Sequence, residues 1–157
     1  MESIIKEAGV LVEAIPYIHA FRRKVFVIKY GGSILENEAI RRNIFQDIIF
    51  LSYVGIRTIL VHGGGPHISS RLKESGIKPE FHNGIRVTDK ATLRIVSEEL
   101  DKLNKQIVRE IKDLQGDVTG LMGDENIIYV KTKKASKDLG FVGRKGRPVR
   151  HRQFLAD

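Results

Sequence analysis

The sequence of 157 residues contains no cysteine. This absence excludes disulfide bonds, thiolate metal sites and cysteine nucleophiles, and it fits a reducing compartment. No apolar run approaches the roughly 20 residues that a membrane-spanning helix needs. The first residues, MESIIKEAGVLVEAIPYI, include acidic side chains and lack the layout of a signal peptide. We therefore expect a cytoplasmic protein with no membrane partner.

What is present is ordinary for a globular protein. Hydrophobic residues make up 41% of the chain and charged residues 29%, so the composition indicates neither disorder nor a fibrous class. A chain of this length can bury about 70% of its unfolded surface, which is enough for one domain with a real core. A second full domain does not fit.

The formal net charge of +8 comes from one part of the chain. Residues 131–152 contain nine basic residues and one acidic residue, whereas the rest contains eighteen of each. A basic tail is usually a solvated surface. Nucleic-acid binding is therefore the less favoured interpretation of this charge, and it predicts a steep dependence of binding on salt.

Strand and helix signals alternate along the chain. They predict an α/β domain with a mainly parallel, open sheet and helices on both faces. A first helix begins near Ser3 and is disturbed at Pro16. Two short β-branched runs, 25–28 and 58–61, indicate buried central strands that end in glycines and lead into helices, the first of which Asn37 caps.

The second half of the chain begins with a change of pattern. Residues 79–88 predict an extended segment or hairpin around the pair Asn83 and Gly84, which is often found where a turn needs positive φ. A long helix follows Asp89, with apolar residues spaced by threes and fours, and ends at Gly116. Two further strands are expected over 118–121 and 127–130.

Lys29 is the first candidate for chemistry. If the two buried strands are neighbours in a parallel sheet, their carboxyl ends open on one edge, where α/β sheets bind ligands. Lys29 ends the first strand and is followed by Gly31 and Gly32. These glycines let the backbone approach a phosphate, while the ammonium neutralises charge. A solvated lysine before a turn is the alternative interpretation of Lys29 taken alone.

The second candidate is the strand-to-helix turn His62-Gly63-Gly64-Gly65-Pro66. It exposes N–H groups at the positive end of a helix, which suits a carboxylate or phosphoryl oxygen. The spacing matches neither the Walker nor the Rossmann motif. Tight packing is the alternative explanation of the glycines, and His62 is interpreted as a packing or hydrogen-bonding residue.

The third candidate is Arg86, in the segment Gly84-Ile85-Arg86-Val87-Thr88-Asp89. An arginine on an extended segment before a capped helix can bind a carboxylate through two parallel hydrogen bonds. An exposed arginine in a salt bridge is the alternative.

The three segments V-I-K-Y-G-G, V-H-G-G-G-P and G-I-R-V-T-D occur in the order and spacing of one family. With them the chain resembles the amino-acid kinase superfamily and, within it, the acetylglutamate kinase family. The resemblance runs from about Leu11 to Gly143 and includes L-V-E-A-I-P-Y-I, N-K-Q-I-V and D-L-G-F-V-G. It implies a three-layer fold and the transfer of a phosphoryl group from ATP, with Mg²⁺, to the side-chain carboxylate of N-acetyl-L-glutamate in arginine biosynthesis.

The resemblance also implies roles for individual residues. Lys29 matches the lysine that stabilises the transferring phosphoryl group, and Gly31, Gly32 and Gly63 belong to the turns that face the phosphate. Gly64 and Gly65 match glycines that bind acetylglutamate, and Arg86 matches the arginine that holds its carboxylate. No resident metal site is expected in this chain.

Members of that family are about twice as long as this chain. We expect the nucleotide pocket, a second catalytic lysine, an aspartate and a substrate-binding asparagine to lie in the half that this sequence does not contain. The chain then supplies the acetylglutamate-binding half and is inactive alone. A fragment, a truncated gene and one piece of a split enzyme are open explanations.

The resemblance divides the chain into three parts. Residues 1–22 form an amino-terminal helix expected to associate subunits into a homo-oligomer, 23–143 form the substrate-binding lobe, and 144–157 form a basic tail at the lobe boundary. Two alternative functions stay open, namely a kinase for another acylated amino acid, such as an aminoadipate derivative, and a non-catalytic module that binds a small acidic metabolite.

Overall fold

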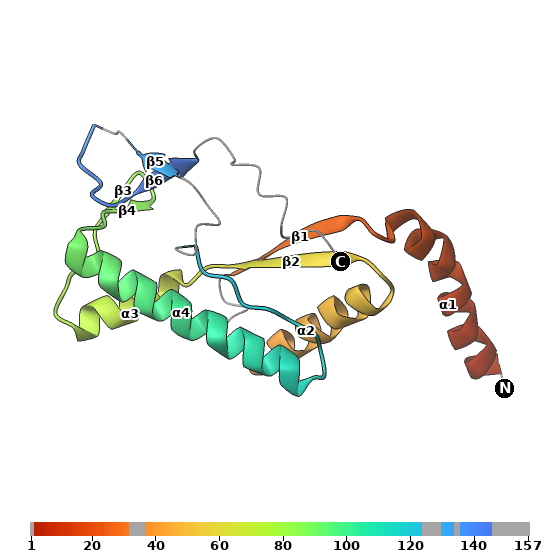
Figure 1. Cartoon of the computed structure of the whole chain (residues 1–157). Helices are drawn as coiled ribbons and strands as arrows, with labels where there is room; N and C mark the ends of the chain where they lie inside the picture. Colours follow the sequence, from red (N-terminus) through yellow and green to blue (C-terminus); the bar gives the residue numbers. More distant parts are fainter. Residues whose placement is uncertain (1, 32–36, 124–129, 134–135, 146–157) are drawn as a thin grey trace. The chain divides into compact units, whose positions relative to one another are not determined.

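A computed structural model describes residues 2–31, 37–123, 130–133 and 136–145. The chain divides into two compact units, which are described separately. Unit 1 comprises Met1–Gly63 and Arg109–Val118, and unit 2 comprises Gly64–Val108 and Thr119–Asp157. The elements, labelled in Figure 1, are α1 Glu2–Phe21, β1 Val25–Tyr30, α2 Glu38–Tyr53, β2 Arg57–His62, α3 Gly65–Glu74, β3 Phe81–His82, β4 Ile85–Arg86, α4 Lys90–Asp113, β5 Val130–Thr132 and β6 Gly143–Lys145.

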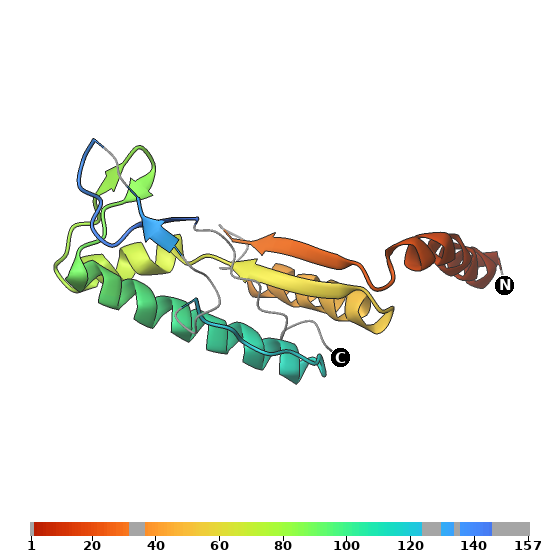
Figure 2. The same ribbon diagram turned by 45° about the horizontal axis from the view of Figure 1, so that its top comes forward.

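Unit 1 is built on a parallel pair of strands. β1 and β2 pair in register, with Lys29 opposite Val61 and Tyr30 opposite His62. Helix α2 connects the two strands and runs along one side of the pair (Figures 1 and 2). Its residues Phe45, Ile48 and Ile49 are buried. The α/β class and the parallel pairing expected from the sequence are therefore confirmed.

The two faces of this pair differ in exposure. Phe26 and Ile28 are half-buried and Tyr30 is buried, whereas Val27 is 67% exposed and Ile59 47% exposed. Because neighbouring residues of a strand point to opposite faces, only one face of the pair is covered by the described residues. Among the described residues, the strands expected to be buried are therefore buried on one face and exposed on the other.

The helices of unit 1 follow the sequence signals. The Asn37 side chain accepts a hydrogen bond of 3.0 Å from the Ile40 N–H, so the predicted cap of α2 is confirmed. Helix α1 does not stop at Pro16 and continues to Phe21. A proline inside a helix removes one backbone hydrogen bond, and here that loss does not end the helix.

A polar cluster lies at the end of β1. Arg41 of α2 forms a 2.6 Å ion pair with Glu110 of α4. The Tyr30 hydroxyl is buried and has no hydrogen-bond partner among the described residues. Burial is the main cause that raises the pKa of Tyr30, with the Arg41 cation opposing it. The ring of Tyr30 lies 5.6 Å from that of Phe45, so this residue anchors the end of the strand in the core.

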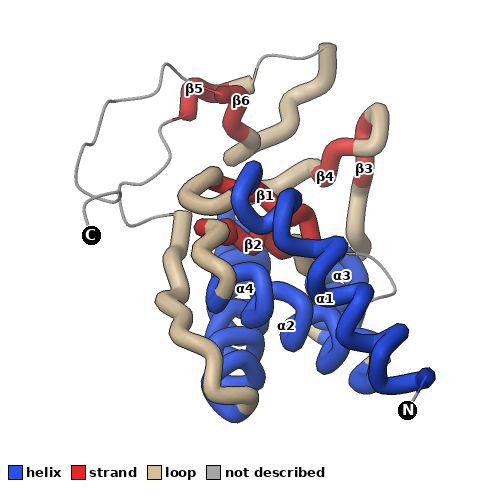
Figure 3. Tube along the Cα trace, turned by 90° about the vertical axis from the view of Figure 1, so that its right-hand side faces the viewer, coloured by secondary structure: helices blue, strands red, loops and turns tan. Residues whose placement is uncertain are grey.

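Unit 2 contains the predicted hairpin and the start of the long helix. β3 and β4 are antiparallel arms joined by Asn83 and Gly84, as the tube in Figure 3 shows. Both turn residues have positive φ, 49° and 75°, as a two-residue hairpin turn requires. The Asp89 side chain then accepts a 2.7 Å hydrogen bond from the Thr92 N–H at the start of α4, which confirms the predicted start.

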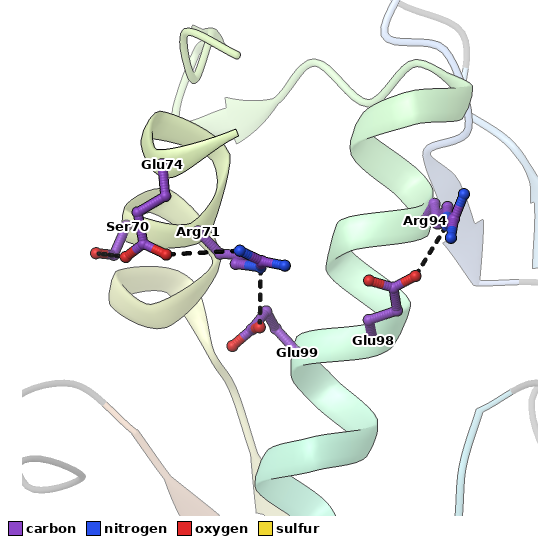
Figure 4. Close-up of polar contacts among 6 residues, drawn as sticks. All are labelled: Ser70, Arg71, Glu74, Arg94, Glu98 and Glu99. Atoms are coloured by element: carbon purple, nitrogen blue, oxygen red, sulfur yellow. Dashed lines mark hydrogen bonds and ion pairs between the residues drawn. The ribbon is translucent and has the colours of Figure 1, made fainter. Parts of the chain in front are cut away.

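Ion pairs lie within and between helices α3 and α4 of unit 2, and one of them joins the two helices (Figure 4). Arg71 of α3 lies 3.7 Å from Glu74 on its own helix and 3.9 Å from Glu99 of α4. Arg94 pairs with Glu98 one turn further along α4 at 2.9 Å. Exposed pairs of this kind stabilise a protein by only about 0–1 kcal/mol each, so buried Ile68 and Leu72 of α3 contribute more to the packing.

A segment from the carboxyl-terminal part contacts the residues that follow the hairpin. The Thr88 N–H donates to the Leu139 carbonyl at 2.9 Å, and the Phe141 N–H donates to the Thr88 carbonyl at 2.7 Å. Gly140 has φ of 68°, and a Cβ there would overlap the Thr88 carbonyl oxygen. Leu139 is 2% exposed, and Lys137 pairs with Glu80. This segment, residues 136–142, is called the strap below.

Two expectations for the carboxyl-terminal part have different outcomes. Residues 118–121 form no strand, so that prediction is wrong. The expected strand over 127–130 falls largely outside the described residues, and only Val130 belongs to a described strand, β5. Residues 146–152 of the basic tail also lie outside them. In the part that the structure describes, no helix has both the length and the apolarity to cross a membrane.

Candidate anion-binding site

The predicted site residues are divided between the two units. Lys29, Gly31 and Gly63 belong to unit 1, and the residues predicted to bind substrate belong to unit 2. Gly32 lies outside the described residues. The structure therefore brings together Gly64, Gly65 and Arg86 in unit 2. Lys29 lies on strand β1 of unit 1.

Lys29 lies near the end of β1 on the exposed face. Its side chain is solvent-exposed, and its partner across the ladder is Val61. Tyr30, the next residue, points to the opposite, buried face. The strand end is fixed further by the Gly63 N–H, which donates to the Tyr30 carbonyl at 3.2 Å. Lys29 is thus an exposed cation on an anchored strand end.

The glycines of the strand-to-helix turn fall into two groups. Gly64 is buried, and a Cβ there would lie 3.1 Å from the Leu100 side chain, so packing against α4 favours glycine. A Cβ at Gly63 or Gly65 would meet no atom within 4 Å. Packing with the described residues therefore explains Gly64, while Gly63 and Gly65 keep the backbone open to a ligand.

The start of α3 provides a positive end without a side-chain cap. Gly64 is the N-cap residue, and its lack of a side chain leaves the first N–H groups of α3 without the usual hydroxyl or carboxylate acceptor. Pro66 occupies the first turn, as the sequence predicted. The N terminus of a helix attracts anions through its dipole and its N–H groups.

Arg86 reaches this helix end from β4. Its Nη2 donates to the Ser69 hydroxyl at 2.9 Å and approaches the Gly65 carbonyl at 3.4 Å. Its guanidinium carbon lies 4.6 Å from the centre of the Phe81 ring, a distance typical of a cation–π interaction. A cation and an uncapped helix end therefore meet within unit 2.

One nitrogen of Arg86 is left without a partner. Nη1 is inaccessible to solvent and has no hydrogen-bond partner among the described residues. Burial lowers the pKa of Arg86, which is the sign expected for a cation that has lost water without gaining an anion. Arginine nevertheless stays protonated in proteins. A half-buried guanidinium beside an uncapped helix start is suited to binding an anion.

Ser69 and Phe81 were not identified from the sequence, although signals for both were present. A two-residue turn at Asn83 and Gly84 places residue 81 opposite residue 86 in the hairpin. Ser69 follows Gly65 by four residues, so it lies on the same side of α3 one turn later. Both positions follow from the turn and helix geometry.

In the described ranges, no group of three or more histidine, cysteine, aspartate and glutamate side chains is placed to hold a metal ion.

Known proteins match this chain in sequence. Residues 24–135 match the amino acid kinase family. An acetylglutamate kinase of Campylobacter jejuni is 43% identical over 143 residues, which cover 91% of this chain and 51% of the relative. Acetylglutamate kinases of Desulforamulus reducens and Thermosynechococcus vestitus are each 44% identical, over 91% and 85% of this chain and 51% and 46% of their own lengths.

Solved structures share the fold. The Neisseria gonorrhoeae N-acetylglutamate synthase complexed with coenzyme A and N-acetyl-glutamate has a TM-score of 0.69 and 23% identity over 88% of this chain and 32% of its own. The Streptococcus mutans protein smu.665 has a TM-score of 0.71 and 23% identity, over 81% and 51%. The chain spans about half the length of the curated relatives it matches. From the family match across residues 24–135, this chain belongs to the amino acid kinase family.

Proposed function

We propose that this chain supplies the substrate-binding half of an acetylglutamate kinase, which transfers a phosphoryl group from ATP to the side-chain carboxylate of N-acetyl-L-glutamate in arginine biosynthesis. One observation carries the proposal, namely the 43% identity to an acetylglutamate kinase over 91% of the chain. The product of the proposed reaction is an acyl phosphate. The geometry of unit 2 and the position of Lys29 support separate parts of this proposal.

Arg86 and the start of α3 support the binding of a carboxylate. The inaccessible Nη1 has no partner among the described residues, and no side chain caps α3. A carboxylate placed there gains a charge-assisted hydrogen bond and the favourable end of a helix dipole. Gly65, where a Cβ would meet no atom within 4 Å, lets the ligand approach the backbone closely. We assign this anion site to a carboxylate of acetylglutamate.

Lys29 supports the phosphoryl-transfer part. Phosphoryl transfer depends mainly on positioning and on stabilising charge over the transferring oxygens, so no covalent nucleophile is required. An exposed ammonium at the end of an anchored strand can neutralise that charge. The turns at Gly31, Gly32 and Gly63 are assigned to the phosphate side of the reaction, although Gly32 lies outside the described residues.

ATP enters this proposal as the phosphoryl donor, with Mg²⁺ bound to its phosphates. The acidic and histidine residues of the described part do not form a metal site. Because the chain spans about half the length of the relatives it matches, we assign to it the binding of acetylglutamate and charge neutralisation, and assign the nucleotide pocket to a second half. The isolated chain is then expected to lack kinase activity.

The test uses a fused enzyme, made by joining this chain to the part of the Campylobacter jejuni relative outside its 143 matched residues. Acyl phosphate is trapped with hydroxylamine and measured for the isolated chain and for the fused enzyme, with ATP, Mg²⁺ and N-acetyl-L-glutamate. We expect product only from the fused enzyme. Robust turnover by the isolated chain would refute the half-enzyme proposal.

The same assay separates the alternatives. Faster turnover of an N-acetylated aminoadipate than of N-acetyl-L-glutamate would indicate the related kinase. A fused enzyme that binds acetylglutamate but forms no acyl phosphate with either substrate would indicate a non-catalytic metabolite-binding module. These outcomes differ in which ligand is bound and which is turned over, so one set of measurements decides among the three functions.

We also propose that α1 associates copies of this chain. Apolar side chains are exposed along its length, including Leu11 at 68% and Tyr17 at 67%. Burial of such groups against a second copy is favourable at about 25 cal/mol per Å². The number of chains per particle in solution, obtained from the particle mass divided by the mass of one chain, is expected to fall on Leu11→Glu and on truncation to a chain starting at Arg22. The same number of chains per particle for all three proteins contradicts this assignment.

A further inference from the structure

Arg86 is held by two side chains that come from separate elements of unit 2. Ser69 of α3 accepts a hydrogen bond of 2.9 Å from Nη2, and the ring of Phe81 on β3 lies 4.6 Å from the guanidinium carbon. The Gly65 carbonyl adds a longer contact of 3.4 Å to Nη2. These contacts involve one nitrogen and one face of the guanidinium, and the buried Nη1 has no hydrogen-bond partner among the described residues.

The position of Phe81 follows from the hairpin. Asn83 and Gly84 both adopt positive φ, and the two-residue turn pairs Phe81 with Arg86 across the ladder. Directly paired residues place their side chains on the same face of a hairpin. The negative face of an aromatic ring attracts a cation, and arginine also stacks on it with its planar group. The hairpin register therefore fixes the plane in which the guanidinium lies.

Ser69 fixes the rotation within that plane. Its hydroxyl stands on the first turns of α3, on the same helix whose start has no side-chain cap. By accepting from Nη2, it directs that nitrogen to the helix and limits rotation of the guanidinium. A freely rotating arginine side chain loses considerable conformational entropy when it binds. Two fixed contacts remove part of that loss before the ligand arrives.

We propose that Phe81 and Ser69 are positioning residues, which pre-orient the guanidinium of Arg86 for a carboxylate. This inference rests on the proposed function, because the carboxylate in question is that of acetylglutamate. Phe81 sets the guanidinium plane, and Ser69 sets its rotation. Neither side chain has to touch the ligand for this effect.

The test compares four variants of the full chain with the wild type. Phe81→Leu removes the aromatic face, and Phe81→Tyr keeps it. Ser69→Ala removes the acceptor, and Ser69→Thr keeps a hydroxyl. The matched control is Phe50→Leu, because Phe50 and Phe81 are both 53% exposed and Phe50 lies in unit 1. Affinity for N-acetyl-L-glutamate is measured by calorimetry, and unfolding is followed by circular dichroism.

Loss of either contact is expected to weaken binding without unfolding the chain. An exposed cation–π contact or a single hydrogen bond corresponds to a change of roughly 3- to 10-fold in affinity. Phe81→Leu and Ser69→Ala should each show a loss of that size, whereas Phe81→Tyr, Ser69→Thr and Phe50→Leu should bind like the wild type. Equal affinity of Phe81→Leu and Ser69→Ala to the wild type overturns the proposal.

A second measurement reads Arg86 directly and does not depend on a ligand. Nitrogen NMR of the guanidinium group reports how fast it rotates about the Nε–Cζ bond. We expect slow rotation for Arg86 in the wild type, in Phe81→Tyr and in Ser69→Thr, and faster rotation in Phe81→Leu and Ser69→Ala. A wild type that binds no acetylglutamate refutes the proposed function, while unchanged rotation in Phe81→Leu and Ser69→Ala refutes the positioning roles.

Discussion

Two cations are assigned to the proposed reaction, and the structure treats them differently. Lys29 is an exposed side chain on the open face of β1, with a flexible four-carbon stem. Arg86 is half-buried, stacks on Phe81 and donates to Ser69, and its Nη1 is inaccessible to solvent. The Arg86 side chain is oriented by contacts with other side chains of unit 2. Among the described residues, Lys29 is held through its backbone in strand β1.

The different orientation of the two side chains matches the different roles proposed for them. A carboxylate that is bound before and after the reaction can be recognised by a group with one fixed orientation, and pre-orientation lowers the cost of binding. A phosphoryl group changes position and charge during transfer, and a lysine ammonium can follow it as a point charge. We therefore expect Arg86 to govern substrate affinity and Lys29 to govern the rate of the chemical step.

The largest effect is expected from Arg86→Ala. Binding of N-acetyl-L-glutamate to the chain should weaken by about 2–5 kcal/mol, because a desolvated charge on the ligand loses its partner. Arg86→Lys should recover only part of this loss, since lysine lacks the planar fork. Calorimetry measures both, with Arg94→Ala as a control in the same unit, shown in Figure 4. Equal affinity of wild type and Arg86→Ala would remove the arginine from the site.

Lys29→Ala should change the rate and leave binding intact. In the fused enzyme kcat should fall on the order of 10²-fold or more, the loss typical of removing a preorganised electrostatic group. Affinity of the chain for acetylglutamate should stay that of the wild type, because Lys29 is not assigned to substrate binding. Lys24→Ala, which changes an exposed lysine just before β1, is the control. An unchanged kcat for Lys29→Ala contradicts the role given to this residue.

Gly140→Ala is expected to weaken the hydrogen bonds between the strap and Thr88, which follows the Arg86 hairpin. The substitution forces a Cβ into the Thr88 carbonyl at a positive φ of 68°, so the strap must move or bear the strain. Such strain costs about 1–3 kcal/mol of unfolding free energy. Denaturant unfolding gives the value, with Gly123→Ala as the control because a Cβ there meets nothing within 4 Å. Two variants of equal stability would show that the strap does not depend on this glycine.

The smallest effect concerns the pH dependence of the α4 cap. The backbone hydrogen bond from Thr92 is the main cause that lowers the pKa of Asp89 below its usual value of 3.8. A lowered carboxyl pKa in the folded state stabilises the fold above 3.8, and this stabilisation fades as the pH falls below that value. The stability difference between wild type and Asp89→Asn should therefore shrink on acidification. A difference that stays constant from neutral pH to pH values below 3.8 contradicts this effect.

Local signals predicted most elements because the residues that cause them are adjacent in sequence. Asn37 and Asp89 cap the helices that they precede, and Asn83 with Gly84 forms the expected turn. The helix expected over residues 1–22 forms with Pro16 inside it, since a single lost hydrogen bond does not end α1. The strand predicted over 118–121 is wrong, because β-branched and apolar residues favour a strand only where a partner strand is available.

The sequence by itself determined the caps, the turns, the parallel strand pair and the order of the three motifs that indicate the family. The tertiary structure decided how the predicted residues are used. It placed Ser69 and Phe81 around Arg86, left Nη1 inaccessible without a partner among the described residues, and exposed one face of β1 and β2. Caps and turns depend on neighbours a few residues away. Burial and the orientation of a charge depend on side chains from several elements, and only the folded chain brings these together.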